Sequence, residues 1–471
     1  MKMRLPNQFR TVVLGTFYLL IGFSTVAQEK KSNQFTVNQA VDYAMKNAPQ
    51  VTNALLDIKI QKEVNREITS NALPHLSASG SFNYFPNIAV QSFPNFIAAA
   101  TYGVLQYEGV KNGSGSTIVP PPDFGFVQAQ FGTKYNANAG IDFSQLLFDG
   151  QVFIGLQARE ASLQFYQNQM EVTKEMIKVN VMKIYYQLLV GRQQLSSIDA
   201  NIIRFEKLLE DTKEINKKGF VEKLDVDKIN VQLNNLKTEK NKVENQLLAG
   251  NAGLKFLMNM PQTEILELKD TITVEMIKEN ILDNAYQYSD RKEFKLLETA
   301  KKLGEFNIRR YQLSNLPTLA AYGNLYRNAQ RNRLNFLNNE PWFKSSLVGV
   351  KLSVPIFEGF AKKARTEKAR LELEKTKNNI VQLKSSIDNE VEQSKLKFAS
   401  SLLNIDIQQK NMELAEKVYN TTKLKYEQGM GSNMEIYNAQ TEWKVSQNNY
   451  YSALYDAIIA RIDYLKAVGK L

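Results

Sequence analysis

The chain repeats its own landmarks in the same order. The segment GIDFSQLLFDG at 140–150 returns as GVKLSVPIFEG at 349–359. LPHLSASG at 73–80 precedes the first copy, and LPTLAAYG at 316–323 precedes the second. Further downstream, KKGFVEKLDVDK resembles EQGMGSNMEIYN. This order predicts a duplicated unit. The two expected repeats and the joint between them are 28–260, 274–471 and 261–273.

Hydrophobic periodicity assigns the same elements to each half: a helix, two strands, a very long helix, a turn and another helix. The helices are expected at 36–70, 151–216, 221–259, 274–314, 360–427 and 432–468. The strands are expected at 75–85, 126–148, 318–327 and 346–357. The loop between the first two strands, 86–125, is long and rich in Pro and Gly. The corresponding loop in the second half is shorter.

The two long helices carry the narrow apolar stripe of a coiled coil. From Val391 to Tyr426 a large apolar residue recurs at every seventh position. From Ile177 to Leu209 apolar residues alternate at spacings of four and three, with Gly191 in one slot. Such a stripe predicts packing on neighbouring helices, and the polar remainder suits a thin wall wetted on both sides. A helix of about 66 residues would span roughly 100 Å, about as much as two of the shorter helices stacked end to end.

The expected strands alternate apolar and polar side chains, which gives a sheet two different faces. In the first strand, Leu76, Phe82 and Tyr84 alternate with Ser77 and Asn83. Strands of ~9–11 residues with an apolar outer face and a polar inner face are typical of outer-membrane barrels. A soluble sheet covered on one face would give the same alternation. Because known barrels need about eight strands or more, four strands predict a barrel shared between copies, with twelve strands from three protomers.

Composition excludes several functional classes. The chain of 471 residues contains no Cys and one His, His75, which excludes disulfides, thiolate metal sites and Cys nucleophiles. No phosphate-binding loop, zinc-ligand spacing or nucleophile set is found. We therefore expect a non-enzymatic protein with no catalytic residues, cofactor or metal. The net charge of +11 comes from Lys and acids that alternate along helices, which argues against nucleic-acid binding.

The N-terminus predicts a secretory signal peptide at 1–27. Lys2, Arg4 and Arg10 precede the apolar run TVVLGTFYLLIGF, and Ala27 marks the expected cleavage site. The run is shorter than the ~20 residues of a spanning helix, although an uncleaved anchor remains the alternative. No second run of that kind follows, so a mature membrane protein would use a β-barrel or an associated surface.

Together these features resemble the TolC-type outer-membrane efflux channel family over about residues 36–468. The most specific segments are LLFDG at 146–150, PIFEG at 355–359, and the two helix reversals at 217–233 and 426–440. The resemblance implies mainly α structure: a trimeric α-barrel of long coiled-coil helices that crosses the periplasm, with a shared twelve-stranded barrel in the lipid of the outer membrane. It implies a homotrimeric, passive exit duct of a tripartite efflux or type I secretion system, which works with a periplasmic adaptor protein and an inner-membrane pump.

The resemblance also places a gate at the periplasmic tip. In the family, acidic side chains after the second helix reversal narrow the tunnel. By motif position Glu435 matches one of them, and Asn438 holds the place of the other. They are one turn apart and share a helix face, and a ring of three Glu435 carboxylates would favour cations. A solvated surface glutamate is the plainer interpretation of Glu435. The candidates for the tip turns and adaptor docking are Lys217, Lys218, Gly219, Phe220, Gly429, Met430, Gly431 and Ser432.

A periplasmic coiled-coil adaptor or scaffold is the alternative function. An adaptor would show one helical hairpin flanked by compact β-domains. This sequence predicts two hairpins and two amphipathic strand pairs instead. The transported substrate and the class of pump are not encoded in any feature of the sequence.

Overall fold

The computed structural model describes residues 32–278, 285–337 and 340–471, so the expected signal peptide lies outside the described residues. The chain forms two compact units. The hairpin unit contains 32–47, Asn180–Met276 and Lys410–Tyr455, and the sheet unit contains Ala48–Val179, Ile277–Gln409 and Asp456–Leu471. Each unit therefore takes segments from both halves of the chain.

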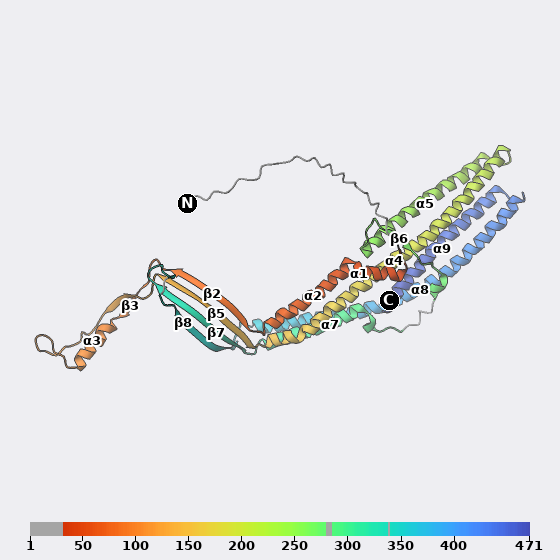
Figure 1. Cartoon of the computed structure of the whole chain (residues 1–471). Coiled ribbons are helices and arrows are strands. Elements are labelled where there is room, and N and C mark those ends of the chain that lie inside the picture. Colours follow the sequence, from red (N-terminus) through yellow and green to blue (C-terminus); the bar gives the residue numbers. More distant parts are fainter. Residues whose placement is uncertain (1–31, 279–284, 338–339) are drawn as a thin grey trace, which may run out of the picture. The chain divides into compact units, whose positions relative to one another are not determined.

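Four antiparallel strands form the main sheet of the sheet unit. They are β2 (His75–Tyr84), β5 (Tyr135–Phe148), β7 (Thr318–Arg331) and β8 (Phe343–Ser353). The strands lie side by side in the order β2-β5-β7-β8 (Figure 1). The centre of the sheet therefore joins β5 from the first half of the chain to β7 from the second.

The sheet unit also contains helices α2 (Pro49–Ser70) and α7 (Lys292–Leu313), and the 3-10 turn η1 (Tyr288–Asp290). The N-terminal parts of the long helices α4 (Gly150–Lys217) and α8 (Ala361–Glu427) belong to it, as does the C-terminal part of α9 (Asn433–Ala467). The loop between β2 and β5 carries β3 (Val90–Pro94), α3 (Phe96–Tyr107) and β4 (Phe126–Gln130).

The two matched strand-to-helix junctions begin their helices differently. In LLFDG, the Asp149 carboxylate accepts the backbone N–H groups of Gln151 at 2.7 Å and Val152 at 3.2 Å. This side chain therefore caps α4, satisfying donors that the helix cannot pair internally. In PIFEG, Gly359 and Phe360 both adopt positive φ (58° and 63°) immediately before α8. A bulky residue rarely adopts that conformation.

The hairpin unit contains the remainders of α4, α8 and α9 together with α5 (Lys223–Met258), α1 (Val37–Asn47) and most of α6 (Val274–Lys278). A small parallel sheet pairs β1 (Ser32–Phe35) with β6 (Ile265–Leu268). The apolar seams of the long helices meet in one core cluster. Its buried members are Ile198, Phe205, Leu208, Leu209, Ile229, Leu233, Leu236, Val243, Ala415, Tyr419, Ile436, Ala439 and Trp443. Each large aliphatic or Phe side chain among them contributes about 1.5–3 kcal/mol on burial.

Gly191 occupies a seam position because α4 and α5 approach closely there. A Cβ added to it would lie 2.8 Å from Leu247 Cδ2. An alanine at this position would therefore have to displace the end of the Leu247 side chain.

The expected single helix over 36–70 is wrong. It is broken at Ala48, whose ψ is 128°, between α1 and α2. Pro49 follows, and proline both lacks an N–H and disfavours helical geometry in the residue before it. It then serves as the first residue of α2, where a missing N–H costs little.

The expected helix over 274–314 is also wrong in its described part. Segment 279–284 lies outside the described residues. After it, the Asp290 carboxylate accepts the backbone N–H of Gln287, and Arg291 is extended (φ −76°, ψ 129°) before α7 begins. Short acidic side chains compete with helix in this way.

The expected strand over 126–148 is two strands. β4 pairs with β3 inside the long loop, and β5 pairs with β2. Between them Gly132 has φ +142°, and the Thr133 hydroxyl donates to Asn136 Oδ1 at 2.8 Å. The expected strand over 346–357 ends at Ser353, because Pro355 cannot donate to a ladder.

Candidate functional site

Strand register gathers the apolar side chains of the main sheet on one face. Leu76 lies opposite Phe143, which lies opposite Gly323, which lies opposite Val348. Alternate residues point to opposite faces, so this row and those two residues away form one apolar surface. Val348 is 89% exposed, so nothing in this single chain covers it. The exposed large apolar residues of this face include Leu76, Phe82, Ile141, Leu325, Val348, Val350 and Leu352.

The opposite face of the sheet is polar. The Tyr326 hydroxyl donates to Asp142 Oδ1 at 2.5 Å, and the Ser79 hydroxyl donates to Asp142 Oδ2 at 3.1 Å. Gly140 lies under Tyr326, and a Cβ there would overlap its ring. The polar residues that register places on this face include Ser77, Ser79, Ser81, Asn83, Asn136, Asn138, Asp142, Ser144, Asn324, Asn328 and Gln330.

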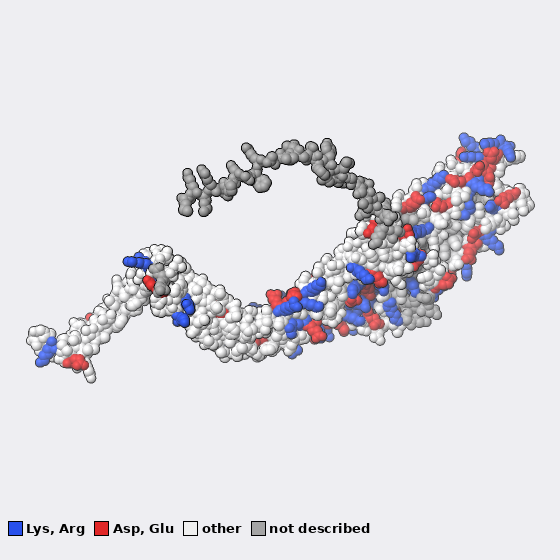
Figure 2. Space-filling view, viewed as in Figure 1, with Lys and Arg blue, Asp and Glu red and all other residues white. Residues whose placement is uncertain are grey.

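The sheet has two open edges. Its order places β2 and β8 at the outside, and each has one neighbour within the described ranges. Open edges present unpaired N–H and C=O groups and are templates for another strand. In Figure 2 the visible surface of the sheet carries few charged side chains, whereas both signs are interspersed over the helices. No helix in the described ranges combines the length and apolar character needed to cross a membrane.

The two helix reversals have the same hydrogen-bond pattern. At the end of α4, Phe220 N–H donates to Ile215 O at 3.2 Å and Gly219 N–H to Asn216 O at 2.8 Å. At the end of α8, Met430 N–H donates to Lys425 O at 2.9 Å and Gly429 N–H to Tyr426 O at 3.0 Å. Gly219 and Gly429 have φ of +78° and +74°. Both reversals are therefore Schellman caps, which glycine favours.

The candidate docking residues lie at these turns and differ in exposure. Phe220 is 80% and Met430 71% exposed, although the residue at this place in a Schellman cap frequently packs on its helix. Lys217 and Lys218 are exposed, and Lys217 pairs with Glu214 at 2.6 Å. Gly431 is tightly placed, because an added Cβ would lie 3.2 Å from Tyr426 N.

Glu435 lies in the first turn of α9. Ser432 is the N-cap of that helix, and its hydroxyl oxygen accepts the Glu435 backbone N–H at 3.2 Å. A carboxylate in a first helical turn complements the helix dipole. Glu435 and Asn438 are both exposed and one turn apart, as expected for one helix face. The first-turn position of Glu435 thus has a structural reason in the helix dipole, and its role at an aperture stays a prediction.

A hollow of about 850 Å³ lies between the two reversals. Four carboxylates line it, and no Lys or Arg does so among the described residues around it. Its acidic lining residues are Asp211, Glu214, Asp225 and Glu427. Its apolar lining includes Ile215, Phe220, Val221 and Met434. This surface suits a partner segment that carries both basic and apolar side chains.

Polar contacts join α9 to the α4–α5 hairpin. The buried Thr212 hydroxyl lies 3.0 Å from Asn433 Oδ1 and also bonds the Leu208 carbonyl. The Lys444 ammonium lies 2.8 Å from Glu239 Oε2. Arg204 lies over the Trp443 ring, 4.2 Å from its centroid. Burial lowers the pKa of Arg204, and a cation–π contact helps retain its charge.

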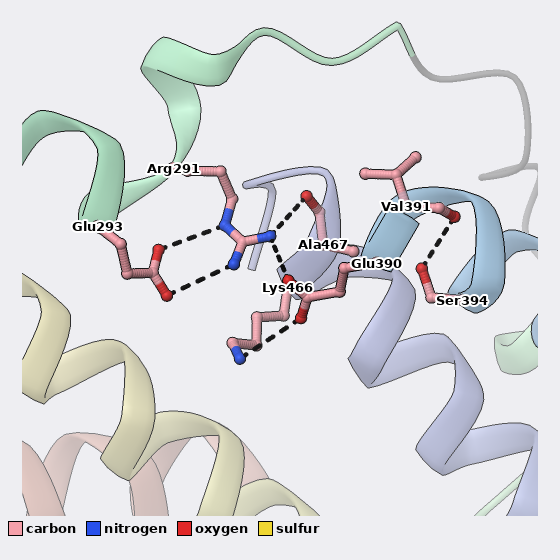
Figure 3. A network of polar contacts seen from close by, with 7 residues as sticks. All are labelled: Arg291, Glu293, Glu390, Val391, Ser394, Lys466 and Ala467. Atoms are coloured by element: carbon pink, nitrogen blue, oxygen red, sulfur yellow. Dashed lines mark hydrogen bonds and ion pairs between the residues drawn. The ribbon is translucent and has the colours of Figure 1, made fainter. Parts of the chain in front are cut away.

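A second polar network, in the sheet unit, was not predicted from the sequence. Figure 3 shows the Arg291 guanidinium between Glu293 on one side and Glu390 and Ala467 on the other. Its Nη1 lies 2.9 Å from Glu390 Oε2 and donates to the Ala467 carbonyl at 3.0 Å. The Arg291 side chain is only 4% exposed. It thus fastens the C-terminal end of α9 to α7 and α8.

Charge within this network moves three pKa values. Burial lowers the pKa of Arg291, but the bonds and charges of Glu293 and Glu390 outweigh it and hold that pKa above its ordinary value. Burial opposes ionisation of Glu293, yet its own backbone N–H and Arg291 keep its pKa lowered. Burial first, and the charge of Glu293 second, raise the pKa of Glu175 on α4. Arginines and glutamates are common on helices, so the sequence carries no signal for this cluster.

No group of three or more His, Asp or Glu side chains in the described part of the chain could hold a metal ion. The two surfaces that stand out are therefore the two-sided sheet and the pair of helix reversals. The chain thus combines a sheet that has one apolar and one polar face with long coiled-coil helices. Solved outer-membrane channels share this fold over most of their length.

VceC from Vibrio cholerae matches with a TM-score of 0.68 at 12% identity, over 92% of this chain and 96% of its own. The CmeC outer membrane channel of Campylobacter jejuni matches with a TM-score of 0.68 at 14% identity, over 100% and 94%. Outer membrane protein TolC of Vibrio cholerae is 20% identical over 402 residues, which are 82% of this chain and 90% of that protein. The outer membrane efflux protein family model matches residues 303–470.

The resemblance to TolC-type outer-membrane efflux channels that was stated from the sequence is therefore confirmed, by the family match at 303–470, the similarity to TolC and the shared fold. The location of the chain in the outer membrane with a periplasmic extension is confirmed with it. The solved structures of OprN and CmeC are outer-membrane channels.

Proposed function

We propose that three copies of this chain form one passive export channel across the outer membrane. The observation that carries the proposal is the main sheet, whose register collects apolar side chains on one face while both of its edges stay open. Pairing β2 of one copy with β8 of the next would close both edges. Twelve strands would result, with the apolar face towards lipid and the Asp142 face towards water.

The duplication is part of this proposal. The β2–β5 pair and the β7–β8 pair would be equivalent parts of the barrel wall. The two Schellman caps would be equivalent helix reversals at the tip. The repeats over 28–260 and 274–471, joined by 261–273, would thus each supply one strand pair and one helical hairpin. Six equivalent repeats in a trimer would give the channel near-sixfold regularity.

The tip is the proposed gate and docking place. The acidic hollow between the reversals, with Phe220 exposed beside it and Met430 at the second turn, supports docking of a helical hairpin from a periplasmic adaptor by helix-in-groove packing. The adaptor would couple the channel to an inner-membrane pump, which supplies the energy. A ring of Glu435 and Asn438 at the first turn of α9 would narrow the closed tip, and splaying of α8 and α9 would open it.

Conductance tests the channel. Purified detergent-solubilised protein should run as a trimer and give discrete single-channel currents in planar bilayers. Glu435→Gln should weaken cation preference, measured as a shift in reversal potential under a salt gradient. A monomeric protein that is soluble without detergent would contradict the trimeric channel, whereas unchanged selectivity would remove only the role of Glu435.

Fractionation separates the channel from the alternative adaptor or scaffold. A channel should stay with the outer membrane through a high-salt wash, because apolar contact with lipid does not weaken with salt. A scaffold held by charge would be released into the wash.

A further inference from the structure

The loop between β2 and β5 contains an uncharged helix. α3 has the sequence FIAAATYGVLQY and carries no Asp, Glu, Lys or Arg. Asn95 caps it, because its side-chain oxygen accepts the Ala98 backbone N–H at 3.1 Å. In Figure 1, α3 and β3 lie beyond one end of the main sheet, at the C-terminal end of β2. The helix is thus a defined element of the loop.

One side of α3 packs on its own loop. Ala98, Tyr102 and Leu105 are half-buried and recur at helical spacing. The Tyr102 ring contacts Phe124, with centroids 5.6 Å apart. The opposite side of α3 therefore faces away from the loop.

The other side of α3 is apolar and uncovered. Phe96, Ile97, Val104 and Tyr107 are exposed by 59%, 61%, 62% and 89%. A helix that is apolar all round belongs in a protein interior. A helix that lies on a lipid surface has a strongly charged or polar face, and α3 has none. A protein partner is therefore the better cover.

The absence of charge points to a second copy of this chain as that partner. Three identical helices that meet around one axis would bring every charge next to its own kind, and α3 has no charge to repel. The loop also leaves the sheet from β2, an open edge that would pair with β8 of the neighbouring copy. This step rests on the proposed trimer.

We propose that the α3 helices of three copies pack against one another through Phe96, Ala100, Val104 and Tyr107. Their contact is a second closure of the channel, at the barrel mouth from which the β2–β5 loop extends. Export then requires these helices to separate as well as the periplasmic tip to open.

Cysteine crosslinking tests this contact directly, because the chain has no Cys of its own. Val104→Cys places a thiol on the outer side of α3. Gln106→Cys places one on the same helix and also exposed, but turned away by about 160° at 100° per residue. Cells that carry either variant are treated with a short bismaleimide and the protein is run on a denaturing gel.

Val104→Cys should give several-fold more crosslinked dimer than Gln106→Cys, with the third copy left unlinked. Equal yields from both variants, or none from Val104→Cys, would overturn the α3 contact. Protection of the Val104→Cys thiol from both the crosslinker and a membrane-impermeant maleimide would assign the helix to lipid and overturn it too.

A charge at the same place gives an independent readout. Val104→Lys brings three ammonium groups together, so single-channel conductance should rise several-fold, while Gln106→Lys should leave it unchanged. Native electrophoresis of every variant separates the two proposals. A trimer that conducts without α3 crosslinks sinks only the outer closure, and a chain that forms no trimer sinks the channel itself.

Discussion

At the scale of single residues, backbone conformation decides the amino acid at the two helix reversals. An added Cβ at Gly219 or Gly429 would meet no atom within 4 Å, so packing does not require glycine there. Both residues adopt positive φ, which costs an L side chain about 1–2 kcal/mol. The requirement is therefore local and would exist in any helix that ends in this way.

Gly429→Ala should destabilise the protein by about 1–2 kcal/mol and lower the thermal midpoint of the purified protein. Gly253→Ala is the matched control within α5, where φ is ordinary and the nearest atom to an added Cβ is Ile184 Cδ1 at 3.9 Å. It should raise the midpoint, since Ala is favoured over Gly in helices by about 1 kcal/mol. Two changes of the same sign would contradict this explanation.

Replacing Glu175 should increase the stability of the protein by an amount that depends on pH. Its folded pKa is raised, so its ionisation destabilises the fold above that pKa, and protonation removes the penalty as pH falls. Glu175→Gln should therefore raise the thermal midpoint at pH 7 by a few degrees. The gain should disappear at a pH below the ordinary value of a Glu carboxyl.

Glu293→Gln should change stability in the opposite direction. Its folded pKa is lowered, so its carboxylate stabilises the fold above the ordinary Glu value, and that contribution is lost as pH falls through the folded pKa. The variant should have a lower midpoint than the natural chain at pH 7 and approach it in acid. Parallel curves for Glu175→Gln and Glu293→Gln would show that burial and not charge governs the cluster.

At the scale of elements, the contact between α4 and α9 near the tip should hold the closed form. Thr212→Val removes the hydroxyl that lies beside Asn433 while keeping the volume, a loss of about 0.5–1.5 kcal/mol. Single-channel conductance or open time should increase. Thr238→Val on the exposed side of α5 removes only a bond to the Asn234 carbonyl and should change neither.

The two faces of β8 should respond differently to charge. Val348→Lys places an ammonium on the apolar face, which costs up to about 2–4 kcal/mol near the middle of a bilayer. Leu347→Lys places it on the polar face one residue away. The yield of heat-resistant outer-membrane trimer should fall for Val348→Lys and stay near normal for Leu347→Lys. Equal yields would contradict the lipid-facing assignment of the apolar face.

Local patterns in the sequence predict some of the helices and strands correctly and miss others. The seam from Val391 to Tyr426 and the strand that begins at His75 were visible as periodicities of seven and two. The break before Pro49 has a signal in the proline itself, but the apolar periodicity continues on both sides of it and favours one longer helix. The turn at Gly132 could not be read, because the alternation continues across it. Arg291 could not be found, since a buried ion cluster depends on contacts between α7, α8 and α9.

At the scale of the whole molecule, the candidate functional surfaces are distributed between the two units. The sheet unit presents the apolar face and the open edges, and the hairpin unit presents the reversals and the acidic hollow. Solved structures share the fold over nearly their full length at 12–15% identity. A fold shared at such low identity is maintained by patterns of side-chain type rather than by particular residues.

Each of the two units combines segments that are far apart in the sequence, and this affects the order in which the protein can fold during synthesis. Asp456–Leu471 belongs to the sheet unit, and the Ala467 carbonyl is one of the groups that bind Arg291. A nascent polypeptide therefore cannot complete the helical part of this unit until Asp456–Leu471 has been synthesised. Until then the buried guanidinium of Arg291 lacks one of its hydrogen-bond acceptors.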